Sequence, residues 1–328
     1  SPDIVFYNNP NIYRQSSVKN INTSFDYLTC YITYSMYLVE NFSYHFDNFQ
    51  INTAWRVYAE SLFSYNLFKN KSPYNGLNVK FYGYPKLDAY NKTNDMINIP
   101  KKIDNGKPIV IYAPHWTIRV DNNWSTFHLY NQFFLKMVKD NPGINFVFKP
   151  HPDLEYRLRA LDDTKKNFTM SRDDYKKYIN EWNSLENGVF VNDGEYIDLF
   201  RKSSCLITDC GSFIAEYLPS KKPCIYLLNP EKPKPLEGYN ELGKKILKTY
   251  HCCNTIEEIN KAIKELIFEN RDDSYKERMS ILKTHFLNIG YSGKEIAEDI
   301  RNEIIDEEEI YESTNLGGRN WVPPCPIY

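Results

Sequence analysis

Residues 205–218 read Cys-Leu-Ile-Thr-Asp-Cys-Gly-Ser-Phe-Ile-Ala-Glu-Tyr-Leu, and this stretch decides the fold. Its apolar start predicts a buried strand, which ends in the polar turn around Gly211. A helix is then indicated by four apolar residues at helical spacing: Phe213, Ile214, Tyr217 and Leu218. A strand, a glycine turn and a helix start direct several free backbone N–H groups at one spot, which suits a phosphate. The alternative is an ordinary strand-to-helix turn of an α/β domain.

Outward from this stretch, strands and helices alternate along the chain. Strands are expected at residues 2–7, 27–32, 78–83, 108–113, 144–148, 189–191, 205–207 and 224–228. Helices are expected at residues 49–70, 125–140, 153–187, 195–203 and 255–268, and from Ser292 onward. Two capping boxes, Thr255 to Glu258 and Ser292 to Glu295, predict where the last two helices begin. This alternation is typical of parallel, doubly wound sheets.

Length and composition narrow the class of protein. The 328 residues suffice for two α/β domains, and the net charge of −2 argues against a nucleic-acid partner. The seven cysteines have no metal-ligand spacing, so reduced thiols are expected. We find neither an apolar run of membrane-spanning length nor a secretory leader. The domains are expected at 1–95 and 108–305, joined by a linker at 96–107 and followed by a tail at 306–328.

Chemically versatile side chains follow four predicted strands of the second half. The candidate site residues are His115, Lys149, His151, Glu195, Thr208, Asp209, Gly211, Ser212 and Glu216. Ligands of doubly wound sheets bind beyond the carboxyl ends of the strands, so these residues are expected to converge. Imidazole, ammonium and amide groups together neutralise charge and protonate an oxygen, as the departure of a nucleotide diphosphate requires.

Several of these residues also have a structural interpretation. His115 fits a packed aromatic pair with the residue after it, and His151, between two prolines, fits a rigid turn. Asp209 fits a cap of its own turn, and Lys149 a solvated strand end. Glu216 lies four residues after Ser212, where it either accepts hydrogen bonds from ribose hydroxyls or faces solvent.

Five segments occur in an order that resembles a known family. They are Gly-Tyr-Pro-Lys-Leu-Asp (83–88), Ile-Tyr-Ala-Pro-His-Trp (111–116), Phe-Lys-Pro-His-Pro (148–152), Glu-Tyr-Ile-Asp-Leu-Phe (195–200) and Ile-Thr-Asp-Cys-Gly-Ser-Phe-Ile-Ala-Glu-Tyr (207–217). The set resembles the CDP-glycerol glycerophosphotransferase family, the polymerases and primases of teichoic acids and related capsular polymers. The resemblance extends over residues 2–300.

The resemblance implies a GT-B architecture, in which two Rossmann-like domains with parallel sheets face each other across a cleft. The second domain would bind a CDP-polyol, CDP-glycerol or CDP-ribitol, and the first would present an acceptor hydroxyl. The reaction would transfer the polyol phosphate and release CMP, with no metal or other cofactor. By motif match, His151 would assist the leaving group. The phosphates would be held by Thr208, Asp209, Gly211 and Ser212, with Glu216 near the ribose.

Two departures from the family pattern concern the first domain. Known members carry a Trp-His-Gly segment there, whereas the corresponding residues 30–35 of this chain contain no histidine. Three alternatives for the base therefore stay open: His45, a tyrosine, or a residue elsewhere in the chain. The first domain is also shorter than a complete GT-B domain, and we expect it to be incomplete.

The resemblance also implies the partners and the location. The acceptor would be a lipid-linked or polymeric polyol phosphate or glycan, reached from the inner face of a bacterial cell membrane through peripheral contact. Two alternatives stay open. One is a nucleotide-sugar glycosyltransferase of the same fold, and the other is a non-catalytic polymer-binding module of a larger capsule synthase.

Overall fold

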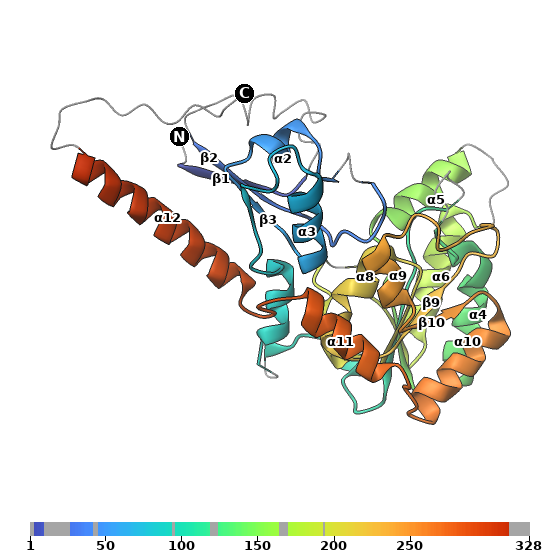
Figure 1. Ribbon diagram of the computed structural model, residues 1–328. Helices are drawn as coiled ribbons and strands as arrows, with labels where there is room; N and C mark the ends of the chain where they lie inside the picture. The colour runs from blue at the N-terminus through green and yellow to red at the C-terminus, as the bar shows by residue number, and fades with distance from the viewer. Residues whose placement is uncertain are drawn as a thin grey trace.

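The computed structural model describes residues 3–9, 27–41, 45–93, 96–118, 124–163, 170–192 and 194–314, arranged in two lobes (Figure 1). The smaller lobe contains one parallel sheet of order β1-β2-β3-β4. Its strands are β1 (Ile4–Tyr7), β2 (Leu28–Ile32), β3 (Arg56–Tyr58) and β4 (Val79–Lys80). The helices α2 (Phe49–Thr53) and α3 (Leu62–Lys71) belong to this lobe.

The prediction of one helix over residues 49–70 is wrong. The helix α2 ends at Ala54, whose backbone is extended, and the side chain of Ser61 caps the start of α3 by accepting from the N–H of Ser64. The strand β3 lies between them and is buried throughout. It pairs with β2 on one side and β4 on the other, and this pairing outweighs the helical spacing of the local apolar residues.

The larger lobe contains a second parallel sheet of order β10-β9-β8-β5-β6-β7. Its strands are β5 (Ile109–Ala113), β6 (Asn145–Phe148), β7 (Gly188–Phe190), β8 (Cys205–Thr208), β9 (Cys224–Leu227) and β10 (His251–Cys253). The helices are α4 (Phe127–Asp140), α5 (Asp153–Asp163), α6 (Arg172–Ser184), α7 (Ile197–Lys202), α8 (Gly211–Glu216), α9 (Glu241–Leu247), α10 (Ile256–Ile263) and α11 (Tyr275–His285). The sequence did not predict α9, β10 or α11.

The central strand β5 is buried on both faces, as its continuous apolar run predicts. Ile109, Ile111 and Ala113 pack into one core of the sheet, whereas Val110 and Tyr112 pack into the other. Apolar side chains therefore cover both faces of the sheet. Polar residues are consequently found in the loops at the ends of the strands.

One predicted capping box is confirmed and the other is wrong. The side chain of Thr255 accepts from the N–H of Glu258 at 3.2 Å, so it caps α10 as predicted. Ser292 is instead the first residue of α12 (Ser292–Thr314), and its hydroxyl donates to the carbonyl of Asn288. The carboxylate of Asp88 caps this helix, accepting from the N–H groups of Ser292 and Gly293 at 2.8 and 2.7 Å. Asp88 belongs to the 3-10 helix η2 (Pro85–Asn91). This residue is far from Ser292 in the sequence, so the local sequence around Ser292 does not reveal the cap.

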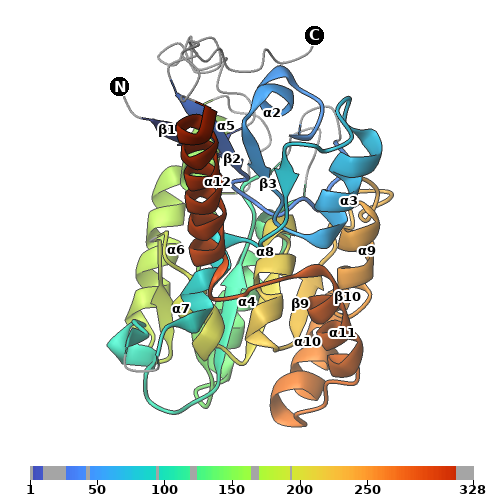
Figure 2. The same ribbon diagram turned by 60° about the vertical axis from the view of Figure 1, so that its left-hand side comes forward.

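The helix α12 runs from the larger lobe back along the first sheet (Figures 1 and 2). Asp299 accepts hydrogen bonds from the hydroxyls of Tyr58 and Tyr82, each at 2.9 Å, and Ile296 packs beside Tyr58 and Cys30. The predicted domain limits assign residues up to 305 to the second domain, yet this described part of α12 contacts the first. Of the predicted tail, residues 306–314 continue the helix and 315–328 lie outside the described residues.

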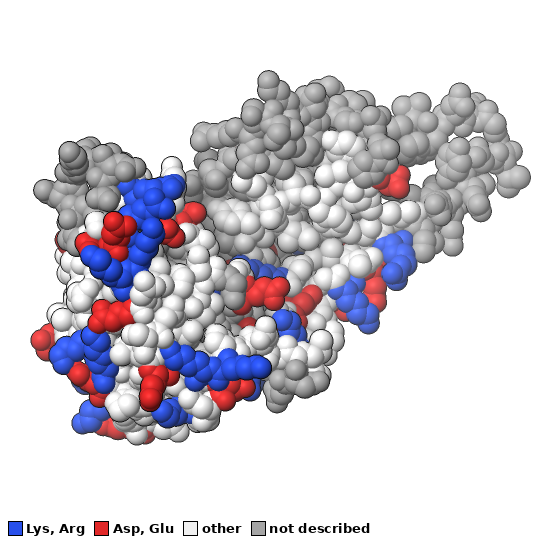
Figure 3. Space-filling model, turned by 180° about the vertical axis from the view of Figure 1, so that it is seen from behind, with Lys and Arg blue, Asp and Glu red and all other residues white. Residues whose placement is uncertain are grey.

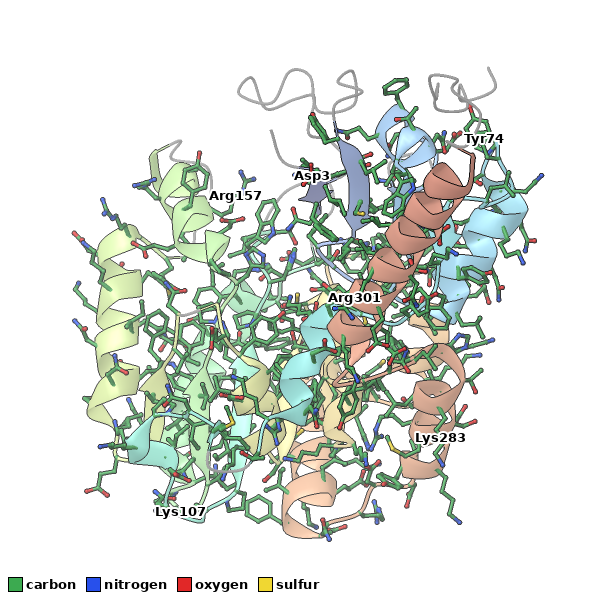
Figure 4. The ribbon with its side chains drawn as sticks, turned by 90° about the vertical axis from the view of Figure 1, so that its left-hand side faces the viewer. Asp3, Tyr74, Lys107, Arg157, Lys283 and Arg301 are labelled. Carbon is green, nitrogen blue, oxygen red and sulfur yellow. The ribbon has the colours of Figure 1, made fainter. Side chains whose placement is uncertain are left out.

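The carboxyl edge of the second sheet faces the first lobe. Lys107, which precedes β5, lies at the far end of the molecule, whereas Arg157 of α5, which follows β6, lies at the end near the first lobe (Figure 4). The chain after β2 reaches across, because Val39 forms an antiparallel bridge with Tyr239. Loops from both lobes therefore meet beside this edge.

The surface carries charges of both signs. On the face in Figure 3, Lys and Arg are interspersed with Asp and Glu, in keeping with the small net charge. Among the described residues, no helix is both long and apolar enough to traverse a bilayer.

Candidate functional site

Two histidines lie together at the carboxyl edge of the second sheet. His115 follows β5 and His151 follows β6, and their ring centroids are 5.3 Å apart. The backbone N–H of His151 donates to the carbonyl of Pro114 at 3.0 Å, which joins the two loops directly. The structure therefore brings together the two histidines that the sequence placed after neighbouring strands.

Both imidazoles are neutral near pH 7 in this arrangement. Burial lowers the pKa of His115 to about 3, and the neighbouring His151 lowers it further. Burial also lowers the pKa of His151, aided by Lys149 and opposed by Asp153. Nδ1 of His151 accepts from the backbone N–H of Asp153 at 3.1 Å, so its proton resides on Nε2. A diphosphate beside the ring would favour the protonated form and raise this pKa.

A polar cluster continues from the histidines toward the first lobe. Lys149 is only 2% exposed, and its ammonium lies 5.3 Å from the ring centroid of Tyr196. Lys86 of η2 lies 4.9 Å from the same ring and 3.2 Å from the carboxylate of Glu216. Tyr196 also donates its hydroxyl to Glu216. Two cations, one from η2 and one that follows β6, thus flank one aromatic ring.

Glu216 is fully occupied within the protein. It is 1% exposed, and burial raises its pKa while the charge of Lys86 opposes the rise. The ribose contact expected from the sequence stays a prediction. In the described arrangement its carboxylate joins the second lobe to Lys86 of η2.

Thr208, the last residue of β8, and Asp209, the first residue of the turn after it, hold loops in place. Thr208 and Asp209 have no exposed surface, and the hydroxyl of Thr208 donates to the carbonyl of Ala113 at 2.6 Å. Asp209 accepts from the backbone N–H groups of His115 and Thr126 and from the hydroxyl of Thr126. Burial raises its pKa to about 6, although these hydrogen bonds oppose the rise. Asp209 therefore anchors the loop that carries His115, which is a positioning role.

The other two residues of this turn begin α8. A Cβ at Gly211 would lie 2.9 Å from the hydroxyl of Tyr239, and the predicted phosphate contact of this residue stays a prediction. Glycine is required at this position by a protein side chain. Ser212 is half-buried, and its hydroxyl lies 3.3 Å from the sulfur of Cys210. Its predicted contact with phosphate stays a prediction.

Two predicted residues remain, one in each lobe. Glu195 is exposed just before α7. His45 lies in the first lobe, 5.2 Å from the ring of Tyr37, and burial lowers its pKa to about 4. Together with Glu60, His45 lines a cavity of about 10 Å³, enough for about one water molecule.

Sequence reasoning missed Glu60, Lys86 and Tyr196. Glu60 is 3% exposed and accepts from the N–H of Tyr37 at 3.2 Å and the hydroxyl of Ser64 at 2.6 Å, and burial raises its pKa. Glu60 lies two residues after the end of β3, and because the sequence analysis missed this strand, it also missed that Glu60 stands at a strand end. Lys86 and Tyr196 belong to two of the five ordered segments that carry the family resemblance. That membership was the sequence signal that could have identified them as site residues.

No group of three or more His, Cys, Asp or Glu residues suited to a metal ion occurs within the described ranges. The candidate site consists instead of imidazole, ammonium, hydroxyl and carboxylate groups from loops of both lobes.

A family model matches residues 32–296, and its description is CDP-glycerol:poly(glycerophosphate) glycerophosphotransferase. The chain belongs to this family. The resemblance seen in the ordered segments is therefore confirmed, and the family is one of transferases that use CDP-glycerol. A comparison with curated proteins found no match.

Solved structures confirm the GT-B-like fold. The wall teichoic acid polymerase TagF superimposes with a TM-score of 0.61 at 15% identity, over 94% of this chain and 74% of TagF. The UDP complex of S. aureus MnaA gives 0.58 at 15% identity, over 92% and 76% of the two chains. The UDP-GlcNAc 2-epimerase from Neisseria meningitidis, bound to UDP-GlcNAc, gives 0.53 at 14% identity, over 92% and 76%. At these identities the likeness concerns the fold alone.

Proposed function

We propose that this protein transfers glycerol phosphate from CDP-glycerol to a hydroxyl of a teichoic-acid-like polymer and releases CMP. Family membership supports the reaction class, and TagF, a structural neighbour, has been studied in the presence of CDPG. The observation that carries the proposal for this chain is the pair His115 and His151 at the sheet edge that faces the first lobe.

In the proposed reaction, an acceptor oxygen attacks the β-phosphorus and the bond from that phosphorus to the bridging oxygen breaks. A bound diphosphate would raise the pKa of His151, and Nδ1 would then exchange the Asp153 N–H for a proton. The doubly protonated ring would give its Nε2 proton to the departing CMP oxygen and return to the neutral imidazole. Lys149 is a buried cation beside the same edge and offsets the negative charge that develops. The acceptor proton is assigned to His45 by way of the one water molecule that the cavity beside this histidine can hold, and burial keeps His45 neutral near pH 7.

The supporting parts have separate roles in this proposal. Asp209 positions the backbone of His115, and the start of α8 at Gly211 and Ser212 provides amide N–H groups near the phosphates. Glu216 keeps η2 against the second lobe through Lys86. The proposal needs no metal or cofactor beyond the nucleotide donor.

We further propose that the acceptor is a lipid-linked or polymeric polyol phosphate of a cell-wall or capsular polymer, encountered by peripheral contact at the inner face of a bacterial membrane. CDP-glycerol and CDP-ribitol share the diphosphate that His151 would contact. The test below therefore includes both donors, and it decides between them.

The test uses purified protein with radiolabelled CDP-glycerol, CDP-ribitol and UDP-sugars. His151→Ala should lower turnover of CDP-glycerol by about 10²–10⁴-fold, the range typical of a lost general acid, with CDP affinity largely retained. His285→Ala, which removes a half-buried histidine of α11, serves as the matched control and should keep turnover. Wild-type turnover in His151→Ala would remove this residue from the mechanism, and transfer from UDP-sugars alone would overturn the donor.

A further inference from the structure

A second cavity lies at the opposite edge of the second sheet from the histidines. Its volume is about 450 Å³, and its polar lining includes Asn91, Arg201, Ser220 and Lys221. Arg201 lies near the end of α7, just before β8, and Lys221 lies just before β9. Both residues therefore stand at the amino ends of strands, whereas the candidate active site occupies the carboxyl ends.

Positive charge accumulates around this cavity. Two pairs of adjacent cations meet there: Arg201 with Lys202, and Lys221 with Lys222. The ammonium of Lys222 donates to the carbonyl of Arg201, and its pKa is lowered to about 8, first by burial and then by the charges of Lys202 and Arg201. The cations thus repel one another in this arrangement.

The nearby carboxylate does not neutralise this charge. Asp198 stands one turn earlier on α7, and its Oδ2 already accepts from the ammonium of Lys92 at 3.3 Å and from the backbone N–H of Asn98 at 3.0 Å. Counting Lys92, five cations stand here, and the ion pair found for them within the described ranges is that of Lys92 with Asp198. An additional anion would relieve the repulsion.

The guanidinium of Arg201 has one group to spare. Its Nη2 donates to the carbonyl of Lys92 at 2.6 Å, while Nη1 is buried and has no hydrogen-bond partner among the described residues. A buried N–H without an acceptor is costly, so a rotation of this side chain that brings Nη1 to a phosphate in the cavity would be favourable, because that hydrogen bond is charge-assisted.

We propose that this cavity binds the phosphate group of a small organic phosphate ester. Arg201 and Lys221 supply the charge, and Ser220 adds a hydroxyl. The apolar walls formed by Leu282 and Ile289, together with a volume well beyond one phosphate, suit an attached organic group. This site is independent of the proposed transfer reaction.

The cavity is lined by both segments of the chain that connect the two lobes. Its walls include Tyr90 and Asn91 of η2, where the chain leaves the first lobe, and Ile289, where the chain returns toward α12. A bound ester would contact both crossings of the chain between the lobes, at the edge remote from His151.

The test measures binding of glycerol 3-phosphate and of inorganic phosphate to the full chain at constant ionic strength, by ³¹P NMR titration. Lys221→Asn should weaken binding of the ester about tenfold, the effect of one lost charge-assisted hydrogen bond. This residue is exposed with φ at 63°, a backbone conformation that asparagine tolerates, so the variant should fold. Lys176→Asn, which removes an exposed lysine of α6, is the matched control and should bind as the wild type does.

His151→Ala separates this cavity from the candidate active site and should leave the binding unchanged. The proposal is overturned by equal affinity in Lys221→Asn and Lys176→Asn, by loss of binding in His151→Ala, or by no saturable binding in the wild type. Inorganic phosphate that binds as tightly as the ester would overturn the organic part of the assignment.

Discussion

Replacing Asp209 by asparagine probes the residue that holds the His115 loop. Its two carboxylate oxygens accept three hydrogen bonds, from the N–H of His115 and from the N–H and hydroxyl of Thr126. An asparagine has one acceptor oxygen, and its NH₂ group must then face a donor. Leaving one buried donor without an acceptor costs about 1–3 kcal/mol of the free energy of unfolding at pH 7.

The contribution of Asp209 to the free energy of unfolding should depend on pH. Burial raises the pKa of Asp209 from 3.8 to about 6, so the folded protein binds this proton more tightly than the unfolded chain does. The associated stabilisation is largest below pH 4 and is lost as the pH rises through about 6. The full pKa difference corresponds to about 3 kcal/mol, of which about 1 kcal/mol is lost between pH 5 and pH 7.

The assay is urea denaturation of wild type and Asp209→Asn at pH 5 and pH 7, with Asp173→Asn, an exposed aspartate of α6, as control. The wild type and the control should each lose about 1 kcal/mol more stability than Asp209→Asn over this interval. An equal pH dependence in all three proteins would refute the reasoning. Direct titration of the Asp209 carboxyl by ¹³C NMR in the wild type provides a second measurement, and a pKa near 4 would refute it as well.

Two further predictions concern the contacts between the lobes. Lys86→Ala leaves the carboxylate of Glu216 buried without its cation, and should lower the free energy of unfolding by about 1–2 kcal/mol, because Lys86 itself is partly exposed. Urea denaturation measures this loss. Adding Glu216→Gln to Lys86→Ala should restore part of the lost stability, because the unpaired charge is then removed. A double variant less stable than Lys86→Ala alone would contradict the pairing. Asp88→Ala removes the cap of α12 and should cost about 1–2 kcal/mol in the same assay. Wild-type stability in this variant would show that the cap contributes nothing.

Periodicity predicted the strands β5 to β9 of the second lobe, which are defined by local pattern, but it missed α9, β10 and α11. The continuous apolar run of β5 and the capping box of α10 need no distant partner to be recognised. The same reasoning failed at β3, where three residues within an apparent helical pattern became a strand. Pairing with β2 and β4 decided that segment, and neither partner is visible in the local pattern.

In the candidate site, too, some features could be predicted from the sequence and others could not. Because parallel strands end at one edge, the order of residues was enough to predict that His115 and His151 meet. The roles of Asp209 and Glu216 were decided by burial, since each carboxylate is enclosed by partners from distant segments.

The sequence by itself determined the α/β class, the family resemblance and the convergence of the two histidines, because these follow from local periodicity, ordered segments and strand order. Only the tertiary structure decided which polar groups are enclosed by other parts of the protein. It set Asp209 against the His115 loop, paired Glu216 with Lys86, and brought Arg201 beside Lys221. Burial and charge pairing depend on residues far apart in the chain, and folding alone brings those residues into contact.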